Sequence, residues 1–294
     1  MSNAIATDRR ANFVGSVLMI AAMAAFACED VFVKAASATL PVGQILVMFG
    51  TGGAVVFASI TLWRGQPLWS PDVLSPPMRV RVVFEILGRL FYTVAIATIP
   101  LSAATVILQA TPLVVVVGAA LIFGETVGWR RWTAILIGLL GVVIVIQPGA
   151  EAFSVLSLLA VVGMLGFAGR DLASRAAPAS ISTTLLGLYG FLAVIVAGVL
   201  FAIWDGKAFV MPDALAAGAM AGAVLAGATA YVCLMRAMRT GEISAVTPFR
   251  YTRLLFGIAL GMAVYGEPLT WPMVAGSCLI VVSGLFILWR STRR

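Results

Sequence analysis

Three arginines, Arg89, Arg250 and Arg253, lie inside stretches apolar enough to be embedded in lipid. A charge at the centre of such a helix costs at least about 2.5–3.5 kcal/mol on insertion scales, so it normally faces a cavity or a partner. A substrate carboxylate is one candidate partner for a guanidinium, and an acid on a neighbouring helix is another. The chemistry indicated is therefore either binding of an anionic group or structural ion pairing.

The spacing of Glu85, Arg89 and Tyr92, at i, i+4 and i+7, places them on one helix face. Two interpretations stay open. In one, Glu85 neutralises Arg89 within the helix. In the other, this face lines a cavity in which Arg89 meets a substrate carboxylate and Tyr92 packs against the remainder of the substrate.

Arg250 and Arg253 are one turn apart, with Tyr251 between them. They require an anionic ligand or acids from neighbouring helices, and Glu85 and Asp171 are the candidates at suitable depth. Polar or soft side chains in other apolar segments could complete a cavity, although such residues more often pack than bind. The predicted substrate-binding residues are Arg89, Tyr92, Gln109, Met164, Phe167, Arg250, Tyr251 and Arg253.

Two acid–base pairs recur with i, i+4 spacing, Asp30 with Lys34 and Asp171 with Arg175. They are interpreted either as ion pairs within one helix or as gates that break in turn. Coupling of transport to protons would need a carboxylate that changes protonation during the cycle. The predicted gating or ion-coupling residues are Asp30, Lys34, Glu85, Asp171 and Arg175.

Two glutamates, Glu125 and Glu267, each end one apolar segment shortly before a tryptophan begins the next. A carboxylate is unfavourable at a helix C-terminus and favourable at a helix N-terminus. Both are therefore predicted to be structural caps of the helices that follow them. Pro112 and Pro248 predict interruptions in the two helices that precede these glutamates.

Several classes of function are excluded by composition. The chain has no histidine, and its three cysteines show no CxxC spacing, which argues against metal sites and His-dependent catalysis. No GxxxxGK[ST] phosphate loop occurs. We expect no metal, no cofactor and no enzymatic activity, and any transport would be secondary or driven by a partner.

The elements that must position these residues are membrane helices. The 294 residues are 62% hydrophobic and 11% charged, whereas soluble domains have about 25% charged residues. Because a bilayer core requires about 20 helical residues, the uncharged stretches predict ten spans. The predicted spans are 12–34, 41–63, 80–99, 102–124, 129–147, 153–173, 181–204, 213–236, 244–265 and 271–290.

Basic residues between the predicted spans are strongly asymmetric. One side holds fourteen arginines, including Arg81 and Arg170, and the other holds only Lys34 and Lys207. Because cytoplasmic loops carry the excess of basic residues, both termini are predicted to be cytoplasmic. The net charge of +7 is thus read as a topology signal rather than as a nucleic-acid interface.

An internal repeat relates the two halves. The segment beginning at Ala27 matches the segment beginning at Ala168 at an offset of 141, and Phe123-Gly-Glu matches Tyr265-Gly-Glu at 142. Five helices per copy is an odd number, so the second copy enters the membrane from the opposite side. The prediction is an all-α polytopic membrane protein of two inverted five-helix repeats, an arrangement that suits alternating access. The predicted parts are a tail at 1–11, repeats at 12–149 and 150–290, and a tail at 291–294.

The two five-helix halves with their Gly-Glu endings, and the segment from Ser244 to Pro268, resemble the drug/metabolite transporter superfamily of the EamA type. Within it the chain is similar to bacterial aromatic amino-acid exporters. The resemblance implies a multi-pass protein of the bacterial inner membrane that exports amino acids or related small amphipathic metabolites. Nucleotide-sugar or drug carriage on the same fold remains an alternative, and a membrane scaffold or an intramembrane enzyme is a weaker one. The expected partners are the substrate and membrane lipids, with the chain as a monomer or a homodimer.

Overall fold

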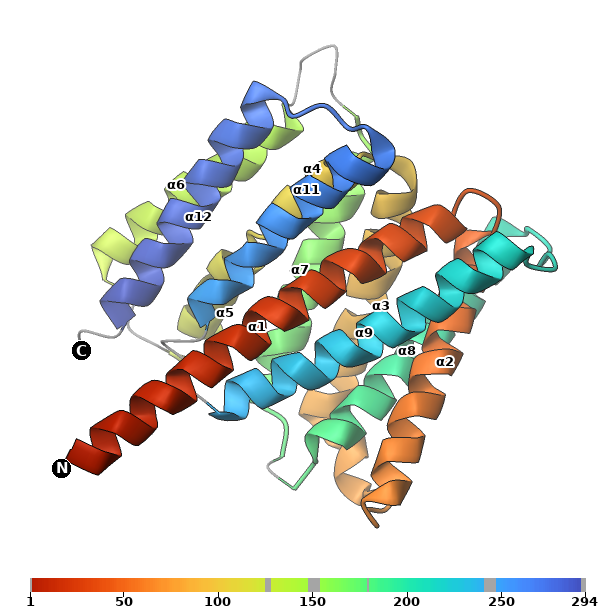
Figure 1. Cartoon of the computed structure of the whole chain (residues 1–294), viewed down its shortest axis with the longest axis horizontal. Coiled ribbons are helices and arrows are strands. Elements are labelled where there is room, and N and C mark those ends of the chain that lie inside the picture. The colour runs from red at the N-terminus through yellow and green to blue at the C-terminus, as the bar shows by residue number, and fades with distance from the viewer. Residues whose placement is uncertain (1, 125–127, 148–153, 179, 241–246, 292–294) are drawn as a thin grey trace.

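In the computed structural model, residues 2–124, 128–147, 154–178, 180–240 and 247–291 are described, and they contain helices and short connections without any strand. Figure 1 shows the helices packed as one bundle. The first half comprises α1 (Ser2–Ala36), α2 (Val42–Trp63), the 3-10 turn η1 (Pro71–Leu74), α3 (Pro76–Thr98), α4 (Leu101–Leu108), α5 (Thr111–Phe123) and α6 (Trp129–Ile146). The second half comprises α7 (Ser157–Arg175), α8 (Thr183–Asp205), α9 (Ala214–Thr240), the 3-10 turn η2 (Thr247–Tyr251), α11 (Thr252–Tyr265) and α12 (Trp271–Ser291).

Within the described residues these elements make ten crossings, if α4 with α5 and η2 with α11 are each counted as one interrupted helix. Their ends lie within four residues of the predicted spans, except that α1 begins at Ser2 rather than at residue 12. Five of the described helices, and the α4–α5 segment taken as one, are long and apolar enough to cross a bilayer. The predicted fold class, an all-helical multi-pass membrane protein, is confirmed. Its orientation in the membrane stays a prediction.

The main helix contacts follow a two-fold pattern. α1 packs on α9 and α3 packs on α7, and these two contacts are equivalent if the halves are exchanged. The contacts of α2 with α8, α4 with α11 and α6 with α12 each map onto themselves under the same exchange. Figure 1 shows α1 crossing α9, with the α6–α12 pair set apart at the edge of the bundle. Every principal contact therefore joins the two repeats.

The interruptions lie where proline was expected to produce them. α4 ends at Leu108 and α5 starts at Thr111, because Pro112 has no N–H to donate to the carbonyl of Leu108. The Thr111 hydroxyl donates to that carbonyl instead, at 2.5 Å. In the other half the 3-10 turn η2 contains Pro248 and leads into α11. The amide Nε2 of Gln109 donates to the Arg250 carbonyl at 3.1 Å, so the two interruptions meet across the repeat interface.

The α3–α7 contact, which carries most of the candidate site, depends on glycine. A Cβ built on Gly166 would lie 2.3 Å from the backbone nitrogen of Gly88. Backbone atoms cannot move aside as a flexible side chain could, so α3 and α7 approach this closely only without a side chain at this position.

Substitution of Gly166 by alanine is expected to destabilise the fold by about 1–3 kcal/mol, because it forces the two backbones apart. Gly218→Ala on α9 is the matched control, since nothing lies within 4 Å of the Cβ it would add. Thermal unfolding of both variants in detergent would measure the difference. Equal unfolding temperatures for Gly166→Ala and Gly218→Ala would contradict the close-packing argument.

Candidate functional site

One cluster of charges joins α3, α7 and η2, and it is called the Asp171 layer here. Its charged members are Arg81, Glu85, Arg170, Asp171 and Arg250. Glu85 bonds Arg81 through Oε2 at 3.3 Å and Arg170 through Oε1 at 3.4 Å. Asp171 bonds Arg170 through Oδ1 at 2.9 Å and approaches Arg250 through Oδ2 at 3.8 Å.

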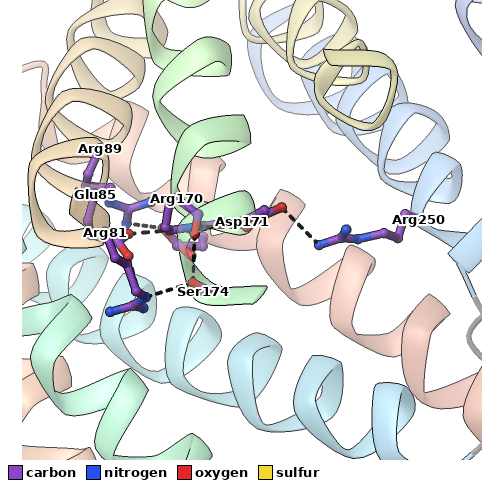
Figure 2. Close-up of polar contacts among 8 residues, drawn as sticks. Arg81, Glu85, Arg89, Arg170, Asp171, Ser174 and Arg250 are labelled. Atoms are coloured by element: carbon purple, nitrogen blue, oxygen red, sulfur yellow. Dashed lines mark hydrogen bonds and ion pairs between the residues drawn. The ribbon is translucent and has the colours of Figure 1, made fainter. Parts of the chain in front are cut away.

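The Asp171 layer is anchored on one side and open on the other. Arg81 is 3% exposed, and its Nε donates to the Ser174 hydroxyl at 2.9 Å. Arg170 lies over the ring of Phe167, 4.8 Å from its centroid. Figure 2 shows Arg250 reaching Asp171 from the side opposite to Arg81 and Glu85. The side chains of Asp171 and Arg250 keep 23% and 30% of their surface exposed, so the protein covers this end of the layer only partly, and it is called the accessible end here.

A second cluster lies about one helical turn further along α3 and is called the Asp30 layer. Its charged members are Glu29, Asp30, Arg89 and Arg253. Asp30 accepts from Arg253 at 2.7 Å and from the Tyr92 hydroxyl at 3.2 Å, while Glu29 is paired with Arg89. Asp30 is 1% exposed and Arg253 14%. This layer is closed, in contrast to the Asp171 layer.

Aromatic rings complete the closure of the Asp30 layer. Arg89 stacks on Phe49 at 4.1 Å, and Arg253 lies over Phe26 at 5.0 Å. Such stacking on ring faces stabilises a guanidinium that has left water. Tyr92 is fully buried and packs edge-on against Phe167, with 5.8 Å between ring centroids. Tyr92 thus contributes to the closed layer, and its hydroxyl is already engaged by Asp30.

A third polar contact lies where the chain leaves α11. Gly266, with φ +63°, ends α11 in a left-handed turn and lets the Glu267 N–H bond the Gly261 carbonyl. The Glu267 carboxylate accepts from the N–H groups of Leu101 and Ser102, at 2.7 and 2.9 Å. These groups are the first turn of α4, where a carboxylate is favoured.

Lys34 completes this contact, 3.6 Å from Glu267, and its ammonium donates to the Ile99 carbonyl at 2.7 Å. Burial opposes ionisation of the Glu267 carboxyl, but hydrogen bonds from Ser102 and Leu101, together with Lys34, outweigh it and lower its pKa. Glu267 therefore caps a helix, but that helix is α4 of the other repeat rather than α12 that follows it.

Two of the predicted ion pairs within single helices, Glu85 with Arg89 and Asp30 with Lys34, are not formed. The third, Asp171 with Arg175, involves a side chain outside the described part of the chain and stays a prediction. Glu85 is held by Arg81 and Arg170, not by Arg89. Asp30 is held by Arg253, and Lys34 by Glu267. Asp30, Lys34 and one oxygen of Glu85 meet partners on other elements of the bundle, whereas the other oxygen of Glu85 pairs within α3 with Arg81, one turn before it, rather than with Arg89. The alternative, that the intramembrane arginines find acids on other helices, is confirmed for Arg250 with Asp171.

The remaining predicted residues have different surroundings. Met164 and Phe167 are buried in the α3–α7 contact, at 2% and 8% exposure, and Tyr251 is buried at 5%. Gln109 joins the two helix interruptions. Glu125 and the side chain of Arg175 lie outside the described part of the chain, so their predicted roles stay predictions.

Four residues of the clusters were not predicted as site residues: Glu29, Arg81, Arg170 and Ser174. Arg81 and Arg170 were interpreted as loop arginines, which is wrong, because both lie inside helices and bond Glu85. A signal existed for Arg170, since it occupies the repeat position of Glu29. Two charged residues at equivalent positions next to two aspartates indicate a conserved location for charge in both copies of the unit.

No group of three His, Cys, Asp or Glu side chains suited to a metal ion occurs among the described residues. The acids of both layers are instead engaged by arginines. Such an arrangement can exchange one carboxylate for another on a guanidinium, and it can break and reform ion pairs as helices move.

The chain is similar to known transporters over nearly its whole length. The chain matches the EamA-like transporter family over residues 13–147 and again over residues 155–289. A pseudopaline exporter of Pseudomonas aeruginosa is 29% identical over 273 residues, covering 92% of this chain and 94% of that protein. A riboflavin transporter of Rhizobium johnstonii is 26% identical, covering 96% and 93%.

A relative and a solved structure with lower sequence identity are also similar to this chain. An S-adenosylmethionine uptake transporter of Rickettsia prowazekii is 22% identical, covering 69% of this chain and 68% of that protein. One solved crystal structure covers 95% of this chain and 98% of its own, with a TM-score of 0.64 and 19% identity, which supports the fold. Since both halves match one family and form two repeats in a single helical bundle, this chain belongs to the EamA-like transporter family, in the drug/metabolite transporter superfamily, as a multi-pass inner-membrane transporter.

Proposed function

We propose that this transporter exports amino acids, or related small amphipathic metabolites, by alternating access. The observation that carries the proposal is the pair Asp171 and Arg250, which are 3.8 Å apart and together the most accessible ion pair of the two layers. An amino acid presents a carboxylate and an ammonium group close together. Arg250 matches the carboxylate and Asp171 the ammonium, so the substrate would replace a weak contact by two stronger ones.

Alternating access is supported by which contacts cross between the repeats. Asp30 with Arg253 and Lys34 with Glu267 each join the first repeat to the second, as does Glu85 with Arg170. The Asp30 layer is closed while the Asp171 layer is accessible. In the predicted orientation the accessible end faces the cytoplasm, as loading of an exporter requires. The opposite state would open the Asp30 layer and close the Asp171 layer.

The names of the relatives bear on the direction of transport and on the class of substrate. The pseudopaline exporter supports export, whereas the riboflavin and S-adenosylmethionine transporters are the observation that favours a second candidate, carriage of a larger cofactor-like metabolite. The name S-adenosylmethionine includes an amino acid, methionine, which fits the same Asp171–Arg250 pair. The two candidates thus share a recognition site and differ in how much substrate lies beyond it.

Purified protein reconstituted into liposomes that are preloaded with a mixture of radiolabelled amino acids would test the proposal. We expect efflux of at least one amino acid above protein-free liposomes, with riboflavin and S-adenosylmethionine loaded in parallel. Efflux of a cofactor-like compound with no amino-acid efflux would favour the second candidate. Absence of any amino-acid efflux from correctly folded protein would overturn the first.

A further inference from the structure

The two charge layers differ in their balance of acids and bases. In the Asp30 layer two acids, Glu29 and Asp30, face two arginines, Arg89 and Arg253. Among the described side chains of the Asp171 layer, two acids face three arginines. The acids are Glu85 and Asp171, and the arginines are Arg81, Arg170 and Arg250. Counted over the described side chains, the closed layer is therefore neutral and the accessible one carries one positive charge in excess.

The excess charge can be assigned to Arg250. Both oxygens of Glu85 are engaged, by Arg81 and Arg170, and Oδ1 of Asp171 is engaged by Arg170. Among the described residues, the acid that the Arg250 guanidinium contacts is Asp171, through Oδ2 at 3.8 Å, and this is the longest ion pair of the layer. Its guanidinium keeps donors available for a ligand, and the accessible side of the layer is where a ligand would arrive.

Alternating access would bury this layer as the Asp30 layer is buried now. Closing around an uncompensated cation is unfavourable, because a charge removed from water needs an opposite charge beside it. A substrate with one carboxylate and one ammonium group adds no net charge and leaves the excess in place. A substrate with two carboxylates and one ammonium group makes four negative charges against four positive ones, which balances the layer and allows it to close.

We propose that the substrates of this transporter carry one more carboxylate than amine, as acidic amino acids and amino-acid derivatives with two carboxylates do. This inference rests on the proposed function, since it concerns the same Asp171–Arg250 pair. It names net negative charge, rather than side-chain size or aromaticity, as the property that the accessible layer selects.

Glutamate and glutamine test the proposal because they are nearly the same size and differ by one negative charge. The efflux rate of glutamate from preloaded proteoliposomes should exceed that of glutamine by at least about tenfold. Glutamine lacks the second carboxylate, and without it a desolvated arginine has no counter-charge. Efflux of glutamine as fast as glutamate would overturn the charge proposal and leave amino-acid export intact. If neither glutamate nor glutamine moves but neutral amino acids of another kind do, the charge proposal fails and the function stands. If no amino acid moves, the function itself fails.

A second experiment adds the missing negative charge to the protein. Ser174 accepts a hydrogen bond from Arg81, so Ser174→Asp places a carboxylate in the layer and supplies the third acid. Ser174→Asn is the matched control of equal size without charge. The preference for glutamate should fall about tenfold or more in Ser174→Asp and persist in Ser174→Asn. Equal preferences in the two variants would contradict the proposal, and if Ser174→Asp does not fold, the comparison in the native protein still decides it.

Discussion

Replacement of Arg253 by methionine is expected to destabilise the protein by about 3–5 kcal/mol, because it leaves the carboxylate of Asp30 buried without a counter-charge. Asp30 is 1% exposed, and one of its oxygens, Oδ1, already has no hydrogen-bond partner. The Tyr92 hydroxyl, at 3.2 Å, would remain as its only donor among the described residues. Unfolding in detergent, followed by circular dichroism, measures the loss.

The double variant Asp30→Asn/Arg253→Met distinguishes the stability contributed by the ion pair from the cost of leaving one of its charges unpaired. Removal of both charges should restore most of the stability lost in Arg253→Met, since a buried ion pair adds little net stability over neutral groups of similar size. Arg250→Met is the control on the same segment, one turn away and 30% exposed. If Arg253→Met is as stable as the native protein, or the double variant is no better than the single one, the Asp30 layer does not close as described.

Replacement of Arg250 by glutamine is expected to reduce substrate efflux by about tenfold to a hundredfold while changing stability by less than about 1 kcal/mol. The structural contribution of Arg250 is small because its contact with Asp171 is long and partly exposed. Its expected contribution to binding is large because it is the surplus cation of the Asp171 layer. Initial efflux rates over a range of internal substrate concentrations would show the effect.

Arg250→Lys gives a graded control for that experiment. It keeps the charge and loses the planar fork, so efflux should lie between the native protein and Arg250→Gln. Native rates in Arg250→Gln would remove this residue from the binding site and leave the fold and family unchanged. The pair of experiments on Arg253 and Arg250 therefore distinguishes a residue that closes the bundle from one that meets the substrate.

The interrupted helix formed by η2 and α11 thus carries two arginines with different expected roles within one turn. Arg250 contacts an acid of its own repeat, and Arg253 contacts an acid of the other repeat, on α1. Movement of the repeats past one another must therefore alter the Arg253 contact, while Arg250 and Asp171 can move together. Gln109 holds the Arg250 carbonyl from the other repeat, which links substrate binding to the position of α4.

Much of the architecture follows from the sequence because it depends on local quantities. The lengths of apolar runs set the number of spans, and nine of the ten are found within four residues of their predicted ends. The near-constant offset of 141 to 142 residues between the halves identifies the repeat, which the family match over 13–147 and 155–289 confirms. The asymmetry of the basic residues persists when Arg81 and Arg170 are left out of it. Twelve of the fourteen arginines then remain against two lysines.

The charge partners between helices were decided by the tertiary structure, whereas Arg81 with Glu85 and Arg170 with Asp171 are local pairs. Spacing along one helix suggested Asp30 with Lys34 and Glu85 with Arg89, yet Asp30 bonds a residue 223 positions away. Local spacing fails here because a long side chain in lipid is neutralised by whichever opposite charge the packing of helices brings nearest, and that packing is set by contacts such as Gly88 against Gly166. The sequence thus determined that buried charges exist and at what depth, whereas the meeting of helices from opposite repeats determined which of them pair across the repeat interface.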